Sequence, residues 1–340
     1  MLRAAADRPV SHMVEAVARA NSNVALVKYW GKRNEALNLP YTGSISITLD
    51  GLATIARAKT RDDLHEDLLA LNGRIVDGHV GARLRSYLDV LRALARRHTQ
   101  LEVALDTNFP VAAGLASSAS TFAALALVGS AVLGMEVSTE QLSILARRGS
   151  GSAARSVHGG FVEWLAGELG DGSDSYAVQL AASDHWRLGL AIAITDEGPK
   201  AVGSGAGMAH SVKRSPFFPT WLEGHDDDLE TIRRGILARD LGLVGAAMEH
   251  NCLKMHAVAL AAQPSLLYWK PATLAVMHRV RELRDEGLEA YFTIDAGPQV
   301  KVLCELADRD AVSAALRNVP GVGRVLLSHP GAGAELVTTA

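Results

Sequence analysis

Four short stretches of the sequence combine charged or hydroxyl side chains with glycine in ways that could support chemistry on anions. The stretch Gly149–Gly160, GSGSAARSVHGG, carries Ser150, Ser152 and Arg155. Hydroxyls donate hydrogen bonds to phosphate, and a guanidinium binds a carboxylate or phosphate through two parallel hydrogen bonds. A Gly/Ser-rich run is also typical of a flexible interdomain linker, so composition alone leaves both an anion-binding loop and a linker open.

The stretch Phe109–Ser120, FPVAAGLASSAS, indicates a strand that runs through a Gly/Ser loop into the start of a helix. Free N–H groups and the helix dipole make such a start a phosphate site. The GxxxxGK[ST] pattern of a Walker A loop is absent. Ser117 and Ser118 could donate hydrogen bonds to phosphate or bind Mg²⁺. The alternative is a helix of small residues that packs closely against a neighbour.

Two further stretches place a lysine and an aspartate at the edges of apolar strands. Lys28 interrupts NVALVKYWGK, which also holds Tyr29 and Lys32, and Asp295 ends the strand of TIDAGPQ. A lysine among apolar residues is costly to bury unless an acid pairs with it, although an edge lysine can keep its ammonium in solvent. Asp295 could equally bind its own turn. Together, the four stretches have the groups that ATP-dependent chemistry on a phosphorylated small acid requires.

Hydrophobic periodicity predicts the elements that position these residues. In the first half we expect strands at 23–29, 44–51, 101–106 and 160–165 and helices at 84–97, 117–135 and 138–148. In the second half we expect strands near 184–196 and 291–305 and helices at 228–239, 243–257, 272–285 and 307–319. We place a domain boundary near Asp184, giving domains 1–184 and 185–340. Residues 1–19 should be a disordered or helical extension, and the tail from 331 should be frayed.

Composition excludes several classes of protein. The chain has 340 residues, 48% hydrophobic and 21% charged, which suits two globular domains. A net charge of −3 gives no global field for nucleic acid or an anionic membrane. The charge-free run 107–135 contains Pro110 and many small residues, so a buried helix is expected there instead of a membrane span. Cys252 and Cys304 lack CxxC spacing, and residues 1–20 lack a signal sequence, which together suit a cytoplasmic protein.

Four motifs, in this order, resemble those of the diphosphomevalonate decarboxylase family of the GHMP kinase superfamily. They are NVALVKYWGKRNEALNLP, PVAAGLASSAS, RRGSGSAARS with GGFVEW, and YFTIDAGPQVKVL, and the similarity extends from about residue 20 to residue 303. The resemblance implies an α+β two-domain GHMP-kinase-like fold. Its N-terminal α/β domain would bind ATP, its C-terminal domain would be ferredoxin-like, and the active-site cleft would lie between them. The resemblance also implies a homodimer.

The resemblance implies an ATP-dependent carboxy-lyase of the mevalonate pathway of isoprenoid biosynthesis. Such an enzyme uses Mg-ATP to phosphorylate the tertiary C3 hydroxyl of mevalonate 5-diphosphate, and loss of phosphate and CO₂ then gives isopentenyl diphosphate. Related chains act on mevalonate 5-phosphate or stop at 3-phosphorylation, and these remain alternatives. A non-catalytic nucleotide-binding protein on the same fold is a third.

The resemblance also assigns roles to individual residues. Asp295, Lys28 and Arg155 would be catalytic, with Asp295 beside the C3 hydroxyl and Arg155 on the substrate carboxylate. The substrate would also bind Tyr29, Lys32, Ser150, Ser152 and Ser204. The ATP phosphates would lie on Pro110, Ala113, Gly114, Leu115, Ala116, Ser117 and Ser118, with Mg²⁺ at Ser117 or Ser118. The chain departs from the family pattern at Thr42, Gly43, His158, Gly205 and Gln299.

Overall fold

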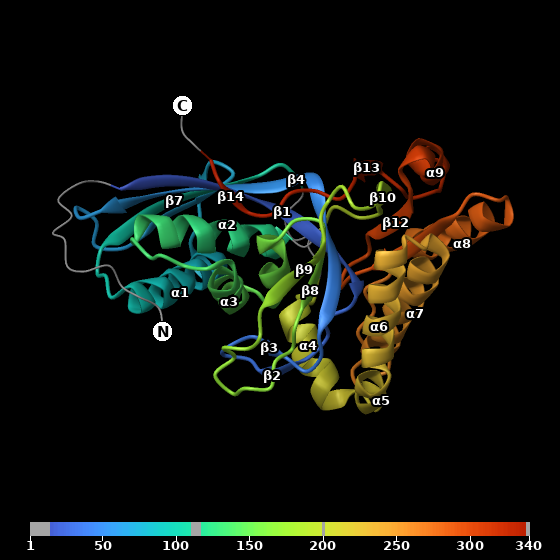
Figure 1. Cartoon of the computed structure of the whole chain (residues 1–340), viewed down its shortest axis with the longest axis horizontal. Coiled ribbons are helices and arrows are strands. Elements are labelled where there is room, and N and C mark those ends of the chain that lie inside the picture. Colours follow the sequence, from blue (N-terminus) through green and yellow to red (C-terminus); the bar gives the residue numbers. More distant parts are fainter. Residues whose placement is uncertain (1–13, 110–116, 199–200, 338–340) are drawn as a thin grey trace.

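The computed structural model describes residues 14–109, 117–198 and 201–337, which form two lobes side by side (Figure 1). The first lobe is built on an eight-stranded sheet in the order β14-β1-β4-β7-β5-β6, with β8 paired to β4 and β9 paired to β8. All of these pairs are antiparallel except β5 with β7. The strands are β1 (Glu15–Val27), β4 (Ser44–Arg61), β5 (Leu68–Leu71), β6 (Arg74–Ile75), β7 (Gln100–Thr107), β8 (Phe161–Trp164), β9 (Ala177–Ala181) and β14 (Glu335–Leu336).

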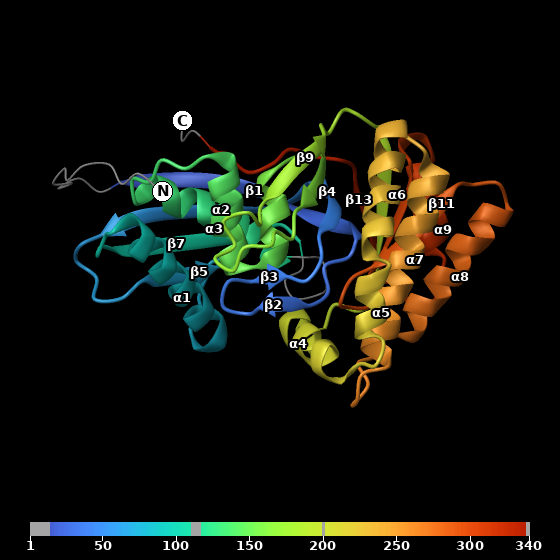
Figure 2. The same cartoon turned by 60° about the horizontal axis from the view of Figure 1, so that its bottom comes forward.

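Three helices cover one face of this sheet: α1 (Gly78–Ala95), α2 (Ser117–Val132) and α3 (Thr139–Gly149) (Figures 1 and 2). From Ser117 the charge-free run therefore forms a buried helix, as predicted. Its small residues allow close packing, since a Cβ added at Gly129 would lie 2.6 Å from Leu91 Cδ1 of α1. Ser138 caps α3 as expected, with a reciprocal pair of hydrogen bonds to Gln141.

The second lobe has a four-stranded antiparallel sheet in the order β11-β12-β10-β13. In chain order this is the strand arrangement 2-3-1-4 with helices after the first and third strands, which is the ferredoxin-like topology that was expected. The strands are β10 (Leu188–Ile194), β11 (Ala290–Ile294), β12 (Val300–Glu305) and β13 (Arg324–Ser328). The helices are α4 (Ser204–Arg214), α5 (Phe218–Glu223), α6 (His225–Ala238), α7 (Leu241–Leu260), α8 (Pro271–Asp285), the short η2 (Leu306–Asp308) and α9 (Arg309–Arg317).

Strand β10 is buried on both faces, which explains its uninterrupted apolar sequence LGLAIAI. One face packs against α7, α8 and α9. The other face belongs to a core that also contains β1 and β4 of the first lobe together with α6. The two lobes therefore share a hydrophobic core, and the ends of β1 and β11 are brought together beside it.

The prediction for the chain ends was wrong where the structure describes them. Residues 15–20 are not disordered or helical but form the first half of β1, paired with Thr54–Lys59 of β4. Pairing with β4 and the burial of Val17, Ala18 and Ala20 override the helix preference of the alanines. In the tail, β14 pairs with Ala18 and Arg19 of β1 and so is not frayed.

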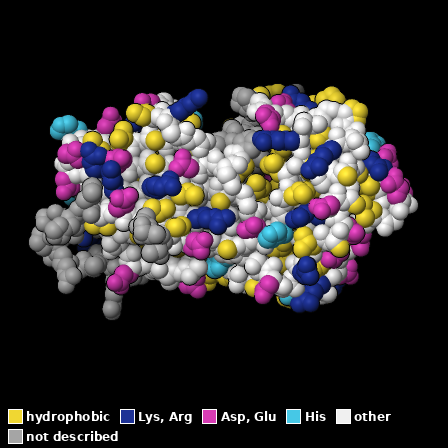
Figure 3. Space-filling view, turned by 90° about the horizontal axis from the view of Figure 1, so that it is seen from above, with side chains coloured by type: hydrophobic (Ala, Val, Ile, Leu, Met, Phe, Trp, Pro, Cys, Tyr) yellow, Lys and Arg dark blue, Asp and Glu magenta, His cyan; other side chains and the backbone are white. Residues whose placement is uncertain are grey.

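The described surface carries both signs of charge. On the face in Figure 3, Lys and Arg side chains are interspersed with Asp and Glu side chains. Within residues 14–109, 117–198 and 201–337, no helix combines the length and the apolar character that a bilayer crossing needs.

Candidate active site

A buried ion-pair cluster lies where the two lobes meet. Lys28 directly follows β1 of the first lobe, and Asp295 directly follows β11 of the second. The Lys28 Nζ lies 2.6 Å from Asp295 Oδ1, and the Nζ of Lys301, a residue of β12, lies 2.8 Å from Asp295 Oδ2. Lys28 is 1% exposed and Lys301 3%. The alternatives in which Lys28 reaches solvent and Asp295 only closes its own turn are therefore wrong.

The two lysines keep Asp295 ionised. Burial alone would raise the pKa of this carboxyl, but the charges and hydrogen bonds of Lys28 and Lys301 outweigh it and hold the pKa well below the usual range. Burial lowers the pKa of Lys301, and Asp295 offsets part of that effect. The Asp295 side chain is still 24% exposed, so a ligand can reach the carboxylate.

Arg155 lies in the loop that composition could not separate from a linker. The loop folds as a 3₁₀ helix, η1 (Gly151–Val157), packed inside the first lobe, so the linker alternative is wrong. Arg155 is 2% exposed and donates to Ser44 Oγ at 2.5 Å and to Asn23 Oδ1 at 3.2 Å. Its Nε is buried with no hydrogen-bond partner among the described residues. Burial lowers the pKa of Arg155 to about 10, an effect that Asp295 and Tyr29 partly offset.

Tyr29 lies directly against this loop. Its ring packs on Trp164 with centroids 4.8 Å apart, and a Cβ added at Gly151 would lie 2.8 Å from the Tyr29 hydroxyl. The hydroxyl is buried and has no partner among the described residues. Burial raises the pKa of Tyr29, and Arg155 opposes that rise. The hydroxyl therefore stays protonated and can donate a hydrogen bond to an anion.

The two predicted anion loops are neighbours in the structure. Ser150 Oγ lies 3.3 Å from Ser118 Oγ and 3.4 Å from Ser152 Oγ. Ser118 is in the first turn of α2, so these hydroxyls lie beside the positive end of a helix. The remaining predicted phosphate-binding residues lie outside the described residues; they are Pro110, Ala113, Gly114, Leu115 and Ala116.

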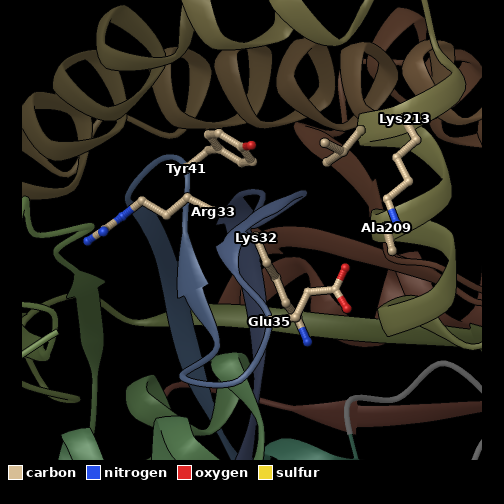
Figure 4. Close-up of a pocket in the computed structure, with 7 residues that line it drawn as sticks. Lys32, Arg33, Glu35, Tyr41, Ala209 and Lys213 are labelled. Carbon is tan, nitrogen blue, oxygen red and sulfur yellow. The ribbon is translucent and has the colours of Figure 1, made fainter. Parts of the chain in front are cut away.

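Lys32 is held at the edge of a pocket between the lobes. It lies in the hairpin of β2 (Lys32–Asn34) and β3 (Leu39–Pro40), and its Nζ donates to Asn38 Oδ1 at 2.6 Å. Burial lowers its pKa, and Arg83 adds to that effect. The pocket has a volume of about 190 Å³ and is lined by Lys32, Arg33, Glu35, Tyr41, Ala209, Val212 and Lys213. Figure 4 shows Lys32 of the hairpin on one side of the pocket and Lys213 of α4 on the other. Helix α4 begins at Ser204.

Sequence reasoning missed three residues of this region. Lys301 could have been noticed by the criterion used for Lys28, because it too interrupts an apolar strand. Arg83 of α1 donates to the Gly149 carbonyl at 3.0 Å and lies over the Phe122 ring. Asn38 has a φ of 52° and donates to the carbonyls of residues 147 and 148, which ties the Lys32 hairpin to the end of α3. Nothing in the local sequence around Arg83 or Asn38 indicates these contacts.

Two departures from the family pattern have structural explanations. The Gln299 amide oxygen accepts from the Thr195 N–H at 2.7 Å and so joins the turn after Asp295 to the end of β10. The His158 ring bonds the Ala177 carbonyl at 2.9 Å. Both side chains form hydrogen bonds with backbone groups.

The described residues fit a nucleotide-bound metal better than a protein-bound one. They contain no group of three or more His, Cys, Asp or Glu side chains that could hold a metal ion. Ser118 offers an oxygen at the start of α2, and Mg²⁺ commonly keeps one or two protein ligands and takes the rest from phosphates and water. The donor set therefore suits Mg²⁺ that arrives with ATP.

Comparison with known proteins agrees with this geometry. Two family models match, the diphosphomevalonate decarboxylase-like N-terminal domain over residues 20–177 and the mevalonate 5-diphosphate decarboxylase C-terminal domain over residues 190–324. The Candida albicans diphosphomevalonate decarboxylase is 34% identical over 328 residues, which are 91% of this chain and 90% of that protein.

Solved structures are similar over nearly the whole chain. Mevalonate diphosphate decarboxylase from Staphylococcus aureus has a TM-score of 0.92 at 37% identity, covering 97% of this chain and 100% of its own. MDDEF in complex with MVAPP, AMPPCP and magnesium has a TM-score of 0.90 at 37% identity, covering 96% and 100%. The two-domain GHMP-kinase-like fold is thus confirmed. The chain belongs to the diphosphomevalonate decarboxylase family.

Proposed function

We propose that this chain catalyses the ATP-dependent decarboxylation of mevalonate 5-diphosphate to isopentenyl diphosphate, with ADP, phosphate and CO₂ as the other products. The observation that carries the proposal is the Lys28–Asp295 pair at the meeting of the lobes. It places an accessible, ionised carboxylate where the first lobe also supplies a buried arginine. The relative solved with MVAPP, AMPPCP and magnesium supports the same substrate, nucleotide and metal.

Arg155 would bind the substrate carboxylate. Its Nε has no partner among the described residues, and its two other nitrogens are already fixed by Ser44 and Asn23. A held guanidinium orients a carboxylate through directed hydrogen bonds. Because the leaving CO₂ is neutral, Arg155 contributes by positioning the group before the bond breaks.

The diphosphate arm would bind the cations and hydroxyls beside the pocket. Lys32 supplies a charge, and Arg83 adds a second near it. Tyr29, Ser150 and Ser152 present hydroxyls around η1, and Ser204 begins α4 on the other side of the pocket. The residues beside the pocket would therefore bind the diphosphate, which remains in the product.

ATP would bind with its phosphates at the start of α2. The N–H groups of a helix start favour phosphate, and the Ser117 and Ser118 hydroxyls of the first turn of α2 would bind a phosphate oxygen or the metal. Mg²⁺, when bound, would neutralise the charge that develops on the phosphates. The 3.3 Å contact between the Ser118 and Ser150 hydroxyls supports binding of the ATP phosphates next to the Gly149–Gly160 loop.

The chemistry needs an anionic group beside C3. In the first step the C3 oxygen bonds the γ-phosphorus as the bond from that phosphorus to ADP breaks, and the hydroxyl proton would pass through Asp295 to solvent. In the second, the C3–O bond breaks with its electrons on phosphate, and the electrons of the bond to the carboxylate form the new double bond as CO₂ leaves. Positive charge develops at C3 as phosphate departs, and Asp295 would stabilise it. Lys28 would hold Asp295 Oδ1 for this purpose.

We also propose that the protein is a cytoplasmic homodimer, as in the family resemblance. Both cysteines are buried free thiols, which is compatible with a reducing compartment. Light scattering of the purified chain would give the mass of the assembly, and a monomer at micromolar concentration would contradict the dimer.

The substrate assignment is tested by supplying Mg-ATP with mevalonate 5-diphosphate, mevalonate 5-phosphate or mevalonate and following ADP and CO₂ together. We expect equal amounts of both products, fastest with the diphosphate. Preference for the monophosphate would point to a phosphomevalonate decarboxylase. ADP without CO₂ would identify a 3-kinase, and neither product would identify a non-catalytic protein.

A further inference from the structure

Both oxygens of the Asp295 carboxylate are held, and by lysines from different lobes. Lys28 takes Oδ1 at 2.6 Å and also donates to the Ala25 carbonyl at 3.0 Å, while its own N–H is fixed by Asn251 of α7 at 2.8 Å. Lys301 takes Oδ2 at 2.8 Å. A carboxylate with a charge-assisted hydrogen bond at each oxygen is fixed in orientation as well as in charge.

The strand register of the second lobe puts Lys301 in this place. Lys301 is opposite Thr293 in the β11–β12 pair, and Asp295 begins the turn that joins these strands. Alternation along β12 directs Val300 and Val302 into the core under α7 and α8, so Lys301 points to the opposite face, toward the first lobe. Lys301 is therefore carried by a central strand and not by a loop.

The other titratable groups around Asp295 do not replace this pair. Arg155 approaches from η1 and adds positive charge. From α7 come Cys252, whose pKa is raised by burial, and His256, whose pKa burial lowers to about 3, so both are neutral near pH 7. Among the described residues, Lys28 and Lys301 are thus the two groups that ion-pair with the carboxylate.

We propose that Lys301 is a positioning residue of the reaction, which fixes Asp295 through Oδ2 and keeps it an oriented anion. Lys28 alone would leave one oxygen of a buried carboxylate without a cation, and the group could then rotate or bind a proton. With both oxygens paired, Asp295 is already charged when substrate binds and when positive charge develops at C3. This inference rests on the proposed function and assigns a second lysine to it.

The test is the pH dependence of turnover in Lys301→Met. Loss of an adjacent cation raises the pKa of a carboxyl by about 1–3 units. We therefore expect the acidic limb of kcat to move, so that kcat of the variant begins to fall at a higher pH than kcat of the wild type, with the KM for ATP unchanged. Lys301→Arg, which keeps the charge, should restore a limb close to that of the wild type. A residue that only supports folding would lower yield or stability without moving the limb.

Two further variants complete the design. Lys59→Met removes a lysine that pairs with Glu102 on the far part of the first sheet, and its pH profile should match the wild type. Lys301→Gln keeps a hydrogen-bond donor without the charge and carries the same test if the methionine variant does not fold. Wild type that forms no CO₂ would refute the proposed function itself. An active wild type with an unmoved limb in the uncharged variant would overturn the role of Lys301.

Discussion

At the scale of single residues, Arg155 shows how a buried cation can be kept ready for an acid. Its described hydrogen bonds go to Ser44 and Asn23, which are neutral. Asn23 in turn donates to the Ser152 carbonyl and to Ser156 Oγ, so the arginine is locked to β1 through its own loop. A substrate carboxylate would supply the counter-ion that these neutral partners leave out.

We predict that Arg155→Lys lowers kcat/KM for the diphosphate substrate by about 10–100-fold, because a charge-assisted hydrogen bond is worth about 1.5–3 kcal/mol. Lysine keeps the charge but lacks the two guanidinium nitrogens that donate to Ser44 and Asn23 at the same time. Steady-state kinetics with saturating ATP measure the effect. Arg57→Lys, in an exposed pair with Asp106, is the matched control and should be neutral. An unchanged rate in Arg155→Lys would remove Arg155 from carboxylate binding.

His256 predicts a specific dependence of stability on pH. Its pKa is lowered to about 3, chiefly by burial, so the folded state holds it neutral while the unfolded chain binds a proton below about pH 6.5. Its stabilising contribution is full above pH 6.5 and is lost as the pH falls toward 3. Between about pH 7 and 5.5 the wild type should lose about 1 kcal/mol of unfolding free energy relative to His256→Gln. Parallel losses in both proteins, measured by denaturant unfolding, would refute this.

At the scale of elements, the 3₁₀ helix η1 depends on a glycine for its contact with Tyr29. A Cβ at Gly151 would lie 2.7 Å from Tyr29 Cε1, so either the ring or the loop must move. We predict that Gly151→Ala raises the KM for the phosphorylated substrate by about 10-fold, the loss of roughly one hydrogen bond. Gly170→Ala, where a Cβ meets nothing within 4 Å, is the control. Wild-type KM in Gly151→Ala would show that the Tyr29 contact is not needed.

Most helices and strands were predictable from the sequence, but the pairing of strands and of side chains from distant parts of the chain was not. Periodicity located β7, α1 and α3 because each carries one apolar face, but it found only residues 44–51 of β4, which continues to Arg61. The motifs located Lys28, Asp295 and Arg155. Lys301 interrupts an apolar strand as Lys28 does and so could have been noticed, but its pairing with Asp295 depends on the β11–β12 register. The strand character of residues 15–20 was missed because it comes from pairing with β4, which local propensity does not encode.

At the scale of the whole molecule, the shared core should make the two lobes unfold together. Ile232 of α6 is fully buried in the core that β1, β4 and β10 also enter. We predict that Ile232→Ala costs about 2–5 kcal/mol and moves one common transition. Far-UV circular dichroism and tryptophan fluorescence should report the same midpoint. Two separate transitions would contradict the shared core.

The domain boundary near Asp184 stays a prediction. Strand β14, from the end of the chain, returns to pair with β1 in the sheet of the first lobe.

The Asp295 carboxylate, paired with Lys28, carries the proposed reaction, and Asp295→Asn is the sharpest test of its role. The amide keeps the size and removes the charge. ADP and CO₂ formation from mevalonate 5-diphosphate and Mg-ATP should both fall by about 10²–10⁴-fold, while the Kd for ATP stays close to the wild-type value. Near-normal CO₂ formation by Asp295→Asn would show that the reaction does not require the Asp295 charge.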